Sequence, residues 1–412
     1  MSVERRCDVA IIGAGMVGAA LAALLARGGA EVALIEGAPL DFNWPEGSTD
    51  KRVSALTVAS ERLLRHIGVW PRLADLGVSP FHEMHVWDGT GINGAGGEIH
   101  FDSADLGEPR LGHIVENRVI QRALIEHLRT CDSVSLHCPL RLNALTVSDT
   151  EVSLDLSDGS VISARLVVGA DGASSRVREL AGLEVRGRDY GQHALVANVA
   201  TEFSHRATAW QRFLPEGPLA FLPLRDGRSS IVWTMQPQSA EVLLAADDEA
   251  FCAELTRAFD ARLGQVIASS PRAAFPLRMQ YAPHYVAPRV ALVGDAAHAI
   301  HPLAGQGANL GFLDAGALAE TLIDALHAGH DPGARAVLRR YERWRKGDNL
   351  ATMMAMDGFD RLFGSRLPPV AWARRFGLKL TDRALPLKNF LMRHAMGLHG
   401  DLPAVARGGM QR

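Results

Sequence analysis

The sequence lacks paired cysteines and an excess of charge of either sign. Its 412 residues include four cysteines, which form neither a Cys-x-x-Cys pair nor a cluster with histidine. Neither a disulfide framework nor a zinc site is indicated, so we expect no metal and a protein of the reducing cytoplasm. A net charge of -3 provides no basic field for a polyanion, which argues against nucleic acid as a partner.

The sequence also lacks an uninterrupted apolar run of membrane-spanning length. Residues 9–26 carry no charge, but Gly13, Gly15 and Gly18 interrupt them at the spacing of a tight turn. We interpret this run as a strand, a turn and a helix, and not as a signal peptide or a membrane span. Internal repeats and low-complexity segments are absent too, and the length favours two connected domains.

The pattern of apolar residues predicts an α/β fold in which one domain interrupts another. Residues 8–12 and 31–36 are typical of buried parallel strands, and residues 16–27 between them of a helix. Four strands separated by turns follow between residues 195 and 235, which is typical of an antiparallel sheet. A strand at 289–293 and a helix at 307–328 then return the chain to the first domain.

The first glycine-rich stretch, Gly13-Ala14-Gly15-Met16-Val17-Gly18, follows a strand and opens a helix. Its glycines permit a tight turn, a close approach of backbone to a pyrophosphate and close helix packing. Glu36 ends the next strand, where a carboxylate can accept hydrogen bonds from a ribose. This fingerprint predicts a bound dinucleotide but fits NAD as well as FAD.

Two further stretches place an acidic residue and small residues after a strand. Residues 167–178 contain Asp171-Gly172 and a helix start, and residues 290–298 contain Gly294-Asp295. A glycine-rich bend at 305–311 then begins a long helix. The amide groups and positive dipole at such a helix start favour an anion.

Together these stretches resemble the class A flavoprotein aromatic hydroxylases, which carry the same three fingerprints in the same order. The sequence is most similar to the ubiquinone-biosynthesis hydroxylase, or 2-polyprenylphenol hydroxylase, group, and the resemblance covers nearly the whole chain. The motifs that carry it are residues 50–56, 115–118, 211–215, 294–298, 348–350 and 356–359.

The resemblance implies that the cofactor is FAD, and it implies a cofactor contact for each motif residue in the first half of the chain. The glycines at 13, 15 and 18 would pack on the FAD pyrophosphate, and Glu36 would hold the adenosine ribose. Arg52 and Asn117 would lie along the pyrophosphate and the ribityl chain. Asp171 would lie near the pyrophosphate, directly or through an arginine or a water molecule.

In the second half, the resemblance implies contacts to the ribityl chain and the flavin ring. Asp295, with Gly294 beside it in the same motif, would bind a ribityl hydroxyl. The backbone from Gly305 through Gly307 to Asn309 would face the pyrimidine edge of the flavin. We expect this helix start to stabilise the anionic reduced flavin.

The resemblance also implies a reaction: hydroxylation of the aromatic ring of a polyprenylated phenol or benzoquinol in ubiquinone biosynthesis. Molecular oxygen would react with reduced flavin to form a C4a-hydroperoxide. Because the cofactor carries this chemistry, the sequence requires no catalytic side chain, and we name none. Only the Gly-x-Gly-x-x-Gly at residues 13–18 lies between a strand and a helix as a dinucleotide fingerprint does, so NAD(P)H would visit transiently, with a separate reductase or ferredoxin as the alternative donor.

Two other functions remain open at this point. The chain could hydroxylate a small soluble aromatic compound, or it could be an accessory flavoprotein that supports a biosynthetic complex without turnover. The ring position, the prenyl length and the oligomeric state are not encoded in any recognisable pattern.

The C-terminal segment differs in composition from the rest of the chain. Residues 361–412 contain ten Lys or Arg, two Asp and no Glu, interleaved with apolar residues. A basic amphipathic surface can bind anionic lipid, so peripheral contact with the inner face of the membrane, or with a biosynthetic complex, is one expectation. A solvated helix face or a subunit contact is the other.

The combined expectation is a Rossmann-like FAD-binding domain interrupted by an antiparallel substrate domain and followed by a helical segment. Its boundaries are 1–80, 112–185 and 284–330 for the FAD-binding domain, 81–111 and 186–283 for the substrate domain, and 331–412 for the helical C-terminal segment.

Overall fold

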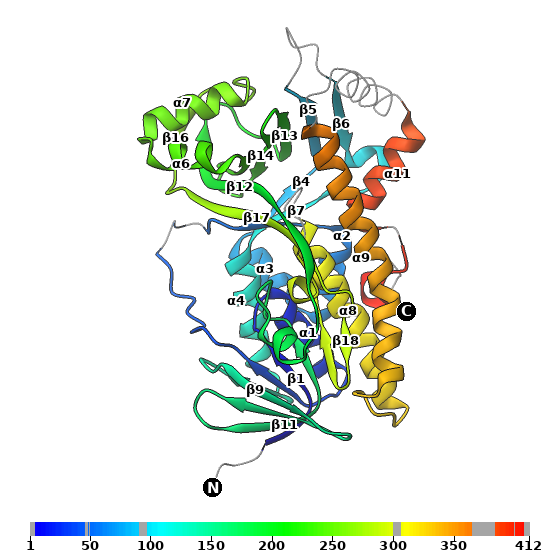
Figure 1. Cartoon of the computed structure of the whole chain (residues 1–412). Helices are drawn as coiled ribbons and strands as arrows, with labels where there is room; N and C mark the ends of the chain where they lie inside the picture. Colours follow the sequence, from blue (N-terminus) through cyan, green and yellow to red (C-terminus); the bar gives the residue numbers. More distant parts are fainter. Residues whose placement is uncertain are drawn as a thin grey trace.

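Three β-sheets organise the chain (Figure 1). The computed structural model describes residues 5–45, 48, 50–89, 97–299, 306–364, 384–398 and 400–407. A largely parallel sheet lies in the lower half of the view and a largely antiparallel sheet in the upper half. This arrangement confirms the expected α/β fold with an interrupting sheet, while the residue boundaries of the domains remain a prediction.

The parallel sheet is built around β1, whose neighbours are β11 on one side and β2 on the other. Residues 9–12 of β1 and all of β2 are buried, as expected for strands that are covered on both faces. Its strands, in spatial order, are β18 (Val286–Ala287), β19 (Val290–Leu292), β11 (Val161–Gly169), β1 (Arg5–Ile12), β2 (Val32–Ile35) and β8 (Val134–His137), and the hairpin strands β9 (Leu142–Val147) and β10 (Val152–Leu156) extend it from β11.

Helices pack against this sheet and share its hydrophobic core. Helix α1 (Met16–Arg27) has the bounds expected from the sequence and contacts both α4 (Asn117–Leu128) and α8 (Gln306–His327). The other helices are α2 (Val58–Ile67), α3 (Trp70–Gly77), α5 (Arg176–Leu180), α9 (Arg335–Gly364) and α11 (Leu385–Ala395), with short 3-10 turns η2 (Ser103–Leu106), η3 (Gly294–Ala296) and η5 (Ala404–Ala406).

The second sheet has nine strands, and only its β13·β5 pair is parallel. Helices α6 (Pro237–Ala245) and α7 (Asp248–Ala258), which the sequence pattern did not reveal, pack on it through side chains such as Phe251 and Leu255. In spatial order its strands are β20 (His298–Ala299), β17 (Ala273–Tyr281), β12 (Arg186–Thr201), β15 (Ser229–Met235), β14 (Gly217–Pro223), β13 (Thr208–Leu214), β5 (Glu83–Asp88) and β6 (Glu98–Asp102), with β16 (Val266–Ser269) paired to β12.

Strand β12 is longer than its sequence pattern indicates. It begins at Arg186 and not at the expected residue 195. Its first residues are mostly exposed and pair with β17, so they carry no alternation of apolar and polar side chains. A third sheet, made of β3 (Val53–Leu56), β7 (Gly112–Glu116) and β4 (Ser79–Phe81), lies between the two larger ones in Figure 1.

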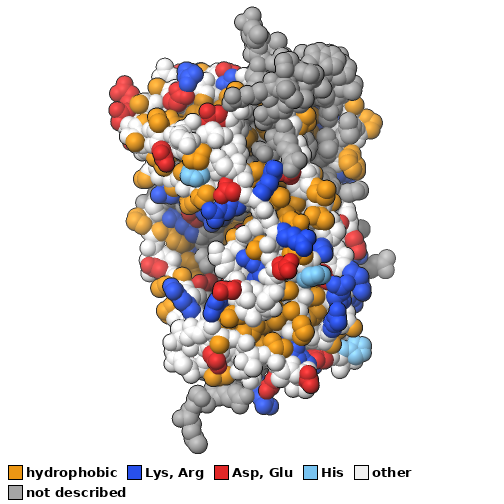
Figure 2. Space-filling model, viewed as in Figure 1, with side chains coloured by type: hydrophobic (Ala, Val, Ile, Leu, Met, Phe, Trp, Pro, Cys, Tyr) orange, Lys and Arg blue, Asp and Glu red, His pale blue; other side chains and the backbone are white. Residues whose placement is uncertain are grey.

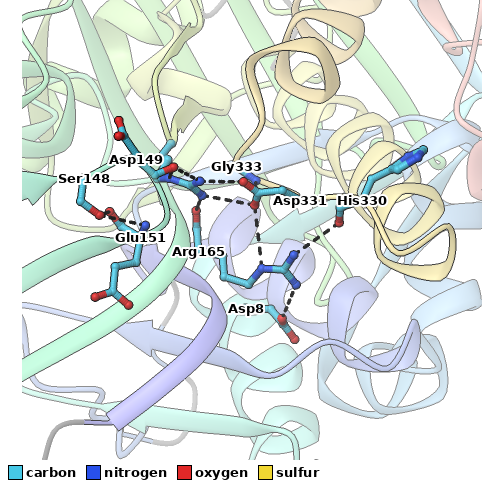
Figure 3. A network of polar contacts seen from close by, with 9 residues as sticks. Asp8, Ser148, Asp149, Glu151, Arg165, His330, Asp331 and Gly333 are labelled. Atoms are coloured by element: carbon cyan, nitrogen blue, oxygen red, sulfur yellow. Dashed lines mark hydrogen bonds and ion pairs between the residues drawn. The ribbon is translucent and has the colours of Figure 1, made fainter.

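Arg289 ties together three segments that are distant in sequence (Figure 3). Its guanidinium donates to the Asp149 carbonyl at 2.9 Å, to the Arg165 carbonyl at 2.8 Å and to the Asp331 carboxylate at 2.6 Å. Arg165 in turn donates to Asp8 at 3.3 Å. The β9–β10 turn, β11, β1 and the α8–α9 connection are thereby held at one end of the parallel sheet.

A second polar cluster is fully buried and joins β19, α8 and α9. Asp314 on α8 is 0% exposed and is hydrogen-bonded to His298. Arg345 on α9 donates to Asp314 at 2.9 Å, and Asn349 donates to the same oxygen at 2.9 Å. The other Asp314 oxygen accepts from the Gly294 amide at 3.2 Å. Burial alone would raise the pKa of Asp314, but His298 and Arg345 outweigh burial and hold the pKa at about 2.

Replacing Asp314 with Asn should destabilise the protein by about 3 to 5 kcal/mol at neutral pH, because it leaves the buried guanidinium of Arg345 without a counter-charge. The folded-state pKa lies below the ordinary value, so the carboxylate stabilises the fold fully above about pH 4 and loses this effect as the pH falls toward 2. Urea unfolding should therefore show a constant difference between parent and variant from pH 8 to 5 and a smaller one below pH 4.

The matched control is Asp324→Asn on the same helix, whose ion pair with Arg340 is more than half exposed. Exposed pairs of this kind contribute less than about 1 kcal/mol. An Asp314→Asn variant as stable as this control would contradict the structural role of the buried cluster.

Candidate functional site

Four parallel strands end at the same edge of the first sheet. Ile12 at the end of β1 pairs with Gly169 at the end of β11 and with Ile35 at the end of β2, and Gly169 pairs with Leu292 at the end of β19. Ligands of open α/β sheets bind at this carboxyl edge. The residues expected to hold a nucleotide follow these strand ends directly.

The three glycines in the turn after β1 have different structural roles. Gly13 has φ +103°, and a Cβ atom there would lie 2.4 Å from the Ala170 carbonyl oxygen. A Cβ atom on Gly18 would lie 2.0 Å from the Gly13 carbonyl oxygen, so helix and turn pack too closely for a side chain. Gly15 caps α1, and its Cβ position has no atom within 4 Å. The open face of the turn therefore lies at the N-terminus of α1, where backbone amides favour an anion.

Glu36 lies directly against this turn. One carboxylate oxygen accepts from the Ala14 amide at 2.8 Å, and the other accepts from the Ala38 amide at 2.8 Å. Each oxygen has a further lone pair, so the carboxylate can also accept hydrogen bonds from a ligand. From α4, Gln121 donates to the Ala14 carbonyl at 2.8 Å and fixes the turn from the other side.

Asp171 packs against the Gly13 turn but has a structural task as well. One of its oxygens accepts from the amides of Arg176 at 2.7 Å and Val177 at 3.1 Å, which caps α5. Its other oxygen is buried without a hydrogen-bond partner. Arg178 points elsewhere, because its guanidinium donates to the carbonyls of Ala173 and Ala296. Asp171 thus keeps one acceptor free for a donor that comes from outside the chain.

Arg52 and Asn117 lie on neighbouring segments at the start of β3 and α4. The Asn117 amide donates to the Arg52 carbonyl at 3.0 Å, and Ser54 donates to the Asn117 side chain at 2.7 Å. Asp50 accepts from the Arg52 amide at 3.1 Å, and its carbonyl accepts from Asn198 of β12 at 3.0 Å. The Arg52 side chain is left exposed at the junction between the first and second sheets.

Gly294 and Asp295 follow β19 and complete the edge. Gly294 has φ +58° and packs on Val17 of α1, as does Gly311 of α8. The Asp295 side chain is exposed, yet enough protein surrounds it that desolvation raises its pKa, while His298 and Arg52 lower it in part. The positive charge of Arg52 thus acts on Asp295 across the edge.

Helix α8 begins beside these residues. Its first residue is Gln306, and Gly307 lies in its first turn, whereas Gly305 lies outside the described residues. The Asn309 side chain is 2% exposed and accepts from the Thr57 amide at 3.0 Å and from Ser60 at 2.7 Å. This side chain fastens α8 to α2, so Asn309 can offer a ligand its backbone and not a free side chain.

The aromatic residues of the second sheet divide into two groups. Trp87, Phe221 and Trp233 are at most 8% exposed and belong to the core under α6 and α7, whereas Phe275 is 42% exposed. The first three are therefore core residues and do not line an open pocket.

Sequence reasoning missed the cluster behind the edge. His298 is the buried partner of Asp314, and the same carboxylate binds the Gly294 amide. Asp314 and Arg345 are 31 residues apart, so no local pattern pairs them. The only available signal was that charged residues stand in otherwise apolar helical faces.

Comparison with known proteins identifies the family. The model of the FAD binding domain family matches residues 6–353. The ubiquinone hydroxylase UbiL of Rhodospirillum rubrum is 43% identical over 410 residues, which cover 99% of this chain and 94% of that protein. The 3-demethoxyubiquinol 3-hydroxylase of Escherichia coli K12 is 41% identical over 394 residues, covering 95% of this chain and 98% of that protein.

Solved structures agree with the sequence comparison. The crystal structure of pqsL, a probable FAD-dependent monooxygenase from Pseudomonas aeruginosa, matches with a TM-score of 0.76 and 26% identity, covering 91% of this chain and 99% of that chain. These similarities confirm the resemblance found in the sequence motifs. The chain belongs to the FAD binding domain family and, within it, to the class A flavin hydroxylases.

Proposed function

We propose that the protein is an FAD-dependent monooxygenase that hydroxylates the aromatic ring of a polyprenylated phenol or benzoquinol in ubiquinone biosynthesis. The observation that carries this proposal is the full-length similarity to two enzymes named for hydroxylation of ubiquinone or its precursor. The similarity extends through the second sheet and α9, and is not confined to the nucleotide fingerprints. Substrate and oxygen are therefore the expected small-molecule partners.

The residues at the carboxyl edge fit FAD. The unfilled space at Gly15 admits a pyrophosphate to the N-terminus of α1, and Glu36 beside it can accept from the adenosine ribose. The exposed carboxylate of Asp295 suits a ribityl hydroxyl, and Arg52 supplies a positive charge next to it. The unpartnered oxygen of Asp171 suits a water molecule or another donor at the pyrophosphate.

Bound FAD would supply the redox chemistry, taking electrons from NAD(P)H, the usual donor in this family, and activating dioxygen for transfer of one oxygen atom. The protein's task is to bind, orient and shield. The backbone amides of the first turn of α8 would stabilise negative charge on the pyrimidine edge of the ring. Glu36 would hold the adenosine ribose and Asp295 the ribityl chain, on either side of the pyrophosphate. The second sheet would hold the substrate ring and exclude water.

A second candidate function is hydroxylation of a small soluble aromatic, since the similar structure of pqsL has also been determined with 2-aminobenzoylacetate. A non-catalytic accessory flavoprotein is a third. Both alternative functions would use the same FAD site, and they would differ in the compound that reaches this site.

Contact with a membrane or a biosynthetic complex is the further part of the proposal. No helix among the described residues is long and apolar enough to cross a bilayer. Leu350 and Met354 lie one turn apart on α9 and are 38% and 67% exposed, and Phe390 on α11 is 50% exposed. On the face of the molecule that Figure 2 displays, Lys and Arg side chains lie in small groups with acidic side chains among them. The basic residues needed for binding to anionic lipid would come from residues 361–412, of which 365–383, 399 and 408–412 lie outside the described part of the chain.

Replacing Asp295 with Ala should lower the affinity for FAD by roughly one to two decades, because a charge-assisted hydrogen bond of about 1.5 to 3 kcal/mol is lost. Unfolding stability of the flavin-free protein should change little, since β19 keeps its packing. Flavin occupancy at limiting FAD measures the first effect and urea unfolding the second.

Asp132→Ala provides the matched control, because this exposed aspartate precedes β8 and so lies at the opposite edge of the same sheet. It should bind FAD like the parent. Equal occupancy in the two variants would remove Asp295 from the cofactor site.

The reaction itself is tested by mass spectrometry of quinone intermediates in a strain that lacks this protein. A polyprenylated ring that lacks one oxygen substituent should accumulate, and its structure names the blocked position. The purified holoenzyme should incorporate one atom of labelled dioxygen into this compound with consumption of NAD(P)H. Unchanged ubiquinone in the deletion strain would favour a soluble aromatic substrate, and complementation without oxygen incorporation would favour the accessory role.

Neutralising Arg374, Arg375 and Lys379, which lie outside the described residues, should weaken binding to anionic vesicles by roughly two decades, at about 1 kcal/mol per basic residue. Added salt should mimic this loss in the parent protein. Flavin content should not change. The control replaces three exposed arginines elsewhere with Gln: Arg129, Arg206 and Arg257. If both triple variants bind vesicles like the parent at low salt, the tail is a solvated face or a protein contact.

A further inference from the structure

Two Glu-x-His sequences face each other on β5 and on the edge strand β6 of the second sheet. Residues 83–85 of β5 and 98–100 of β6 carry the pattern. In the antiparallel register His85 lies directly opposite His100. Because side chains alternate along a strand, Glu83 and Glu98 lie on the same face as the two histidines.

Three of these side chains converge on one point. The Glu83 carboxylate oxygen lies 2.9 Å from Nε2 of His100 and 3.6 Å from Nε2 of His85. One ligand atom of each residue lies within 4.8 Å of the others. A tetrahedral ion with bonds of about 2.0 to 2.1 Å holds its ligand atoms about 3.3 to 3.4 Å apart. The two separations that involve Glu83 bracket that value, and the ligand nitrogens of the two histidines lie within 4.8 Å of each other, so an ion would tilt the two imidazoles out of their stack to direct both nitrogens at it.

The surroundings hold His85 in the orientation that an ion needs. Its Nδ1 is hydrogen-bonded to Glu98 at 3.1 Å, which leaves Nε2 directed at Glu83. A carboxylate on the far nitrogen is the usual second-layer partner of a metal-binding histidine. Glu98 is fixed in turn by Arg262 at 2.6 Å.

Stacking fixes the plane of the same ring. The His85 ring lies between His100 and Trp210, with ring centroids 4.1 Å and 4.5 Å away. The three residues come from the adjacent strands β6, β5 and β13. The site is thus held from both faces of the ring and from its far nitrogen.

We propose that Glu83, His85 and His100 bind a divalent transition-metal ion, with Zn²⁺ as the ion best suited to two imidazoles and one carboxylate. The side chains are 41%, 19% and 39% exposed, so water can complete the coordination. The ion would join β5 to β6 and stabilise the outer edge of the second sheet. The site shares no residue with the FAD site and does not depend on the proposed function.

The test uses the tag-free holoenzyme, dialysed against a chelator and titrated with zinc in competition with a chromogenic chelator. We expect one zinc ion per chain. His85→Ala and His100→Ala should each lose this binding, and Glu98→Gln should weaken it by about 10- to 100-fold through its effect on His85. Hydrogen exchange of β5 and β6 should slow on addition of zinc in the parent only.

The matched control is His284→Ala, which removes an exposed histidine that also lies beside a glutamate, Glu342, at 3.7 Å. It should bind zinc like the parent. All variants should keep the flavin content and the zinc-free melting temperature of the parent, and His100→Gln replaces any alanine variant that does not fold. The proposal is overturned if the parent binds no zinc, if the His85 and His100 variants bind it equally well, or if His284→Ala abolishes binding.

Discussion

The parallel pairing of β1 with β11 is the constraint on which the rest of the molecule depends. Ile12 and Gly169 are joined in register although they lie 157 residues apart in the sequence, as do the other paired positions of the two strands. This pairing brings the Gly13 turn against Ala170 and Asp171 so closely that no Cβ atom fits at Gly13. Because β2 and β19 are in the same register, the ends of four strands form one edge. The helices that begin after these strands place their positive N-terminal ends at this edge.

The buried cluster at Asp314 connects this edge to helix α9, near the other end of the chain. A single carboxylate holds the Gly294 amide, His298, Arg345 and Asn349. Helix α9 then reaches the second sheet, where Met356 packs near Val86 and Phe213, and Asp357 is paired with Arg188 of β12. The nucleotide edge and the sheet proposed to hold substrate are therefore coupled through one helix. The charge of the Asp314 carboxylate is costly to bury, and the fold tolerates it because the carboxylate is fully paired.

The second sheet is stabilised by different contacts at its centre and at its edge. Its centre is covered by α6 and α7 over a continuous apolar core, whereas the edge strand β6 and its neighbour β5 carry polar side chains on one face. Edge strands are the part of a sheet most in need of additional fixation. Ion pairs, stacked rings and the proposed metal site all act at this edge, and they do so without contributing to the cofactor site.

The sequence by itself determined the fold class and the bounds of α1, and it predicted which motif residues follow the strand ends. These features depend on local order: apolar periodicity, turn-forming residues and glycines whose conformation no other residue adopts. Only the tertiary structure decided that Asp171 caps α5, that the Asn309 side chain fastens α8 to α2, and that Trp87 and Trp233 are core residues. It also decided the partners of Asp314 and the meeting of Glu83, His85 and His100. Such contacts join segments far apart in the chain, and their geometry exists only after the strands have taken their register.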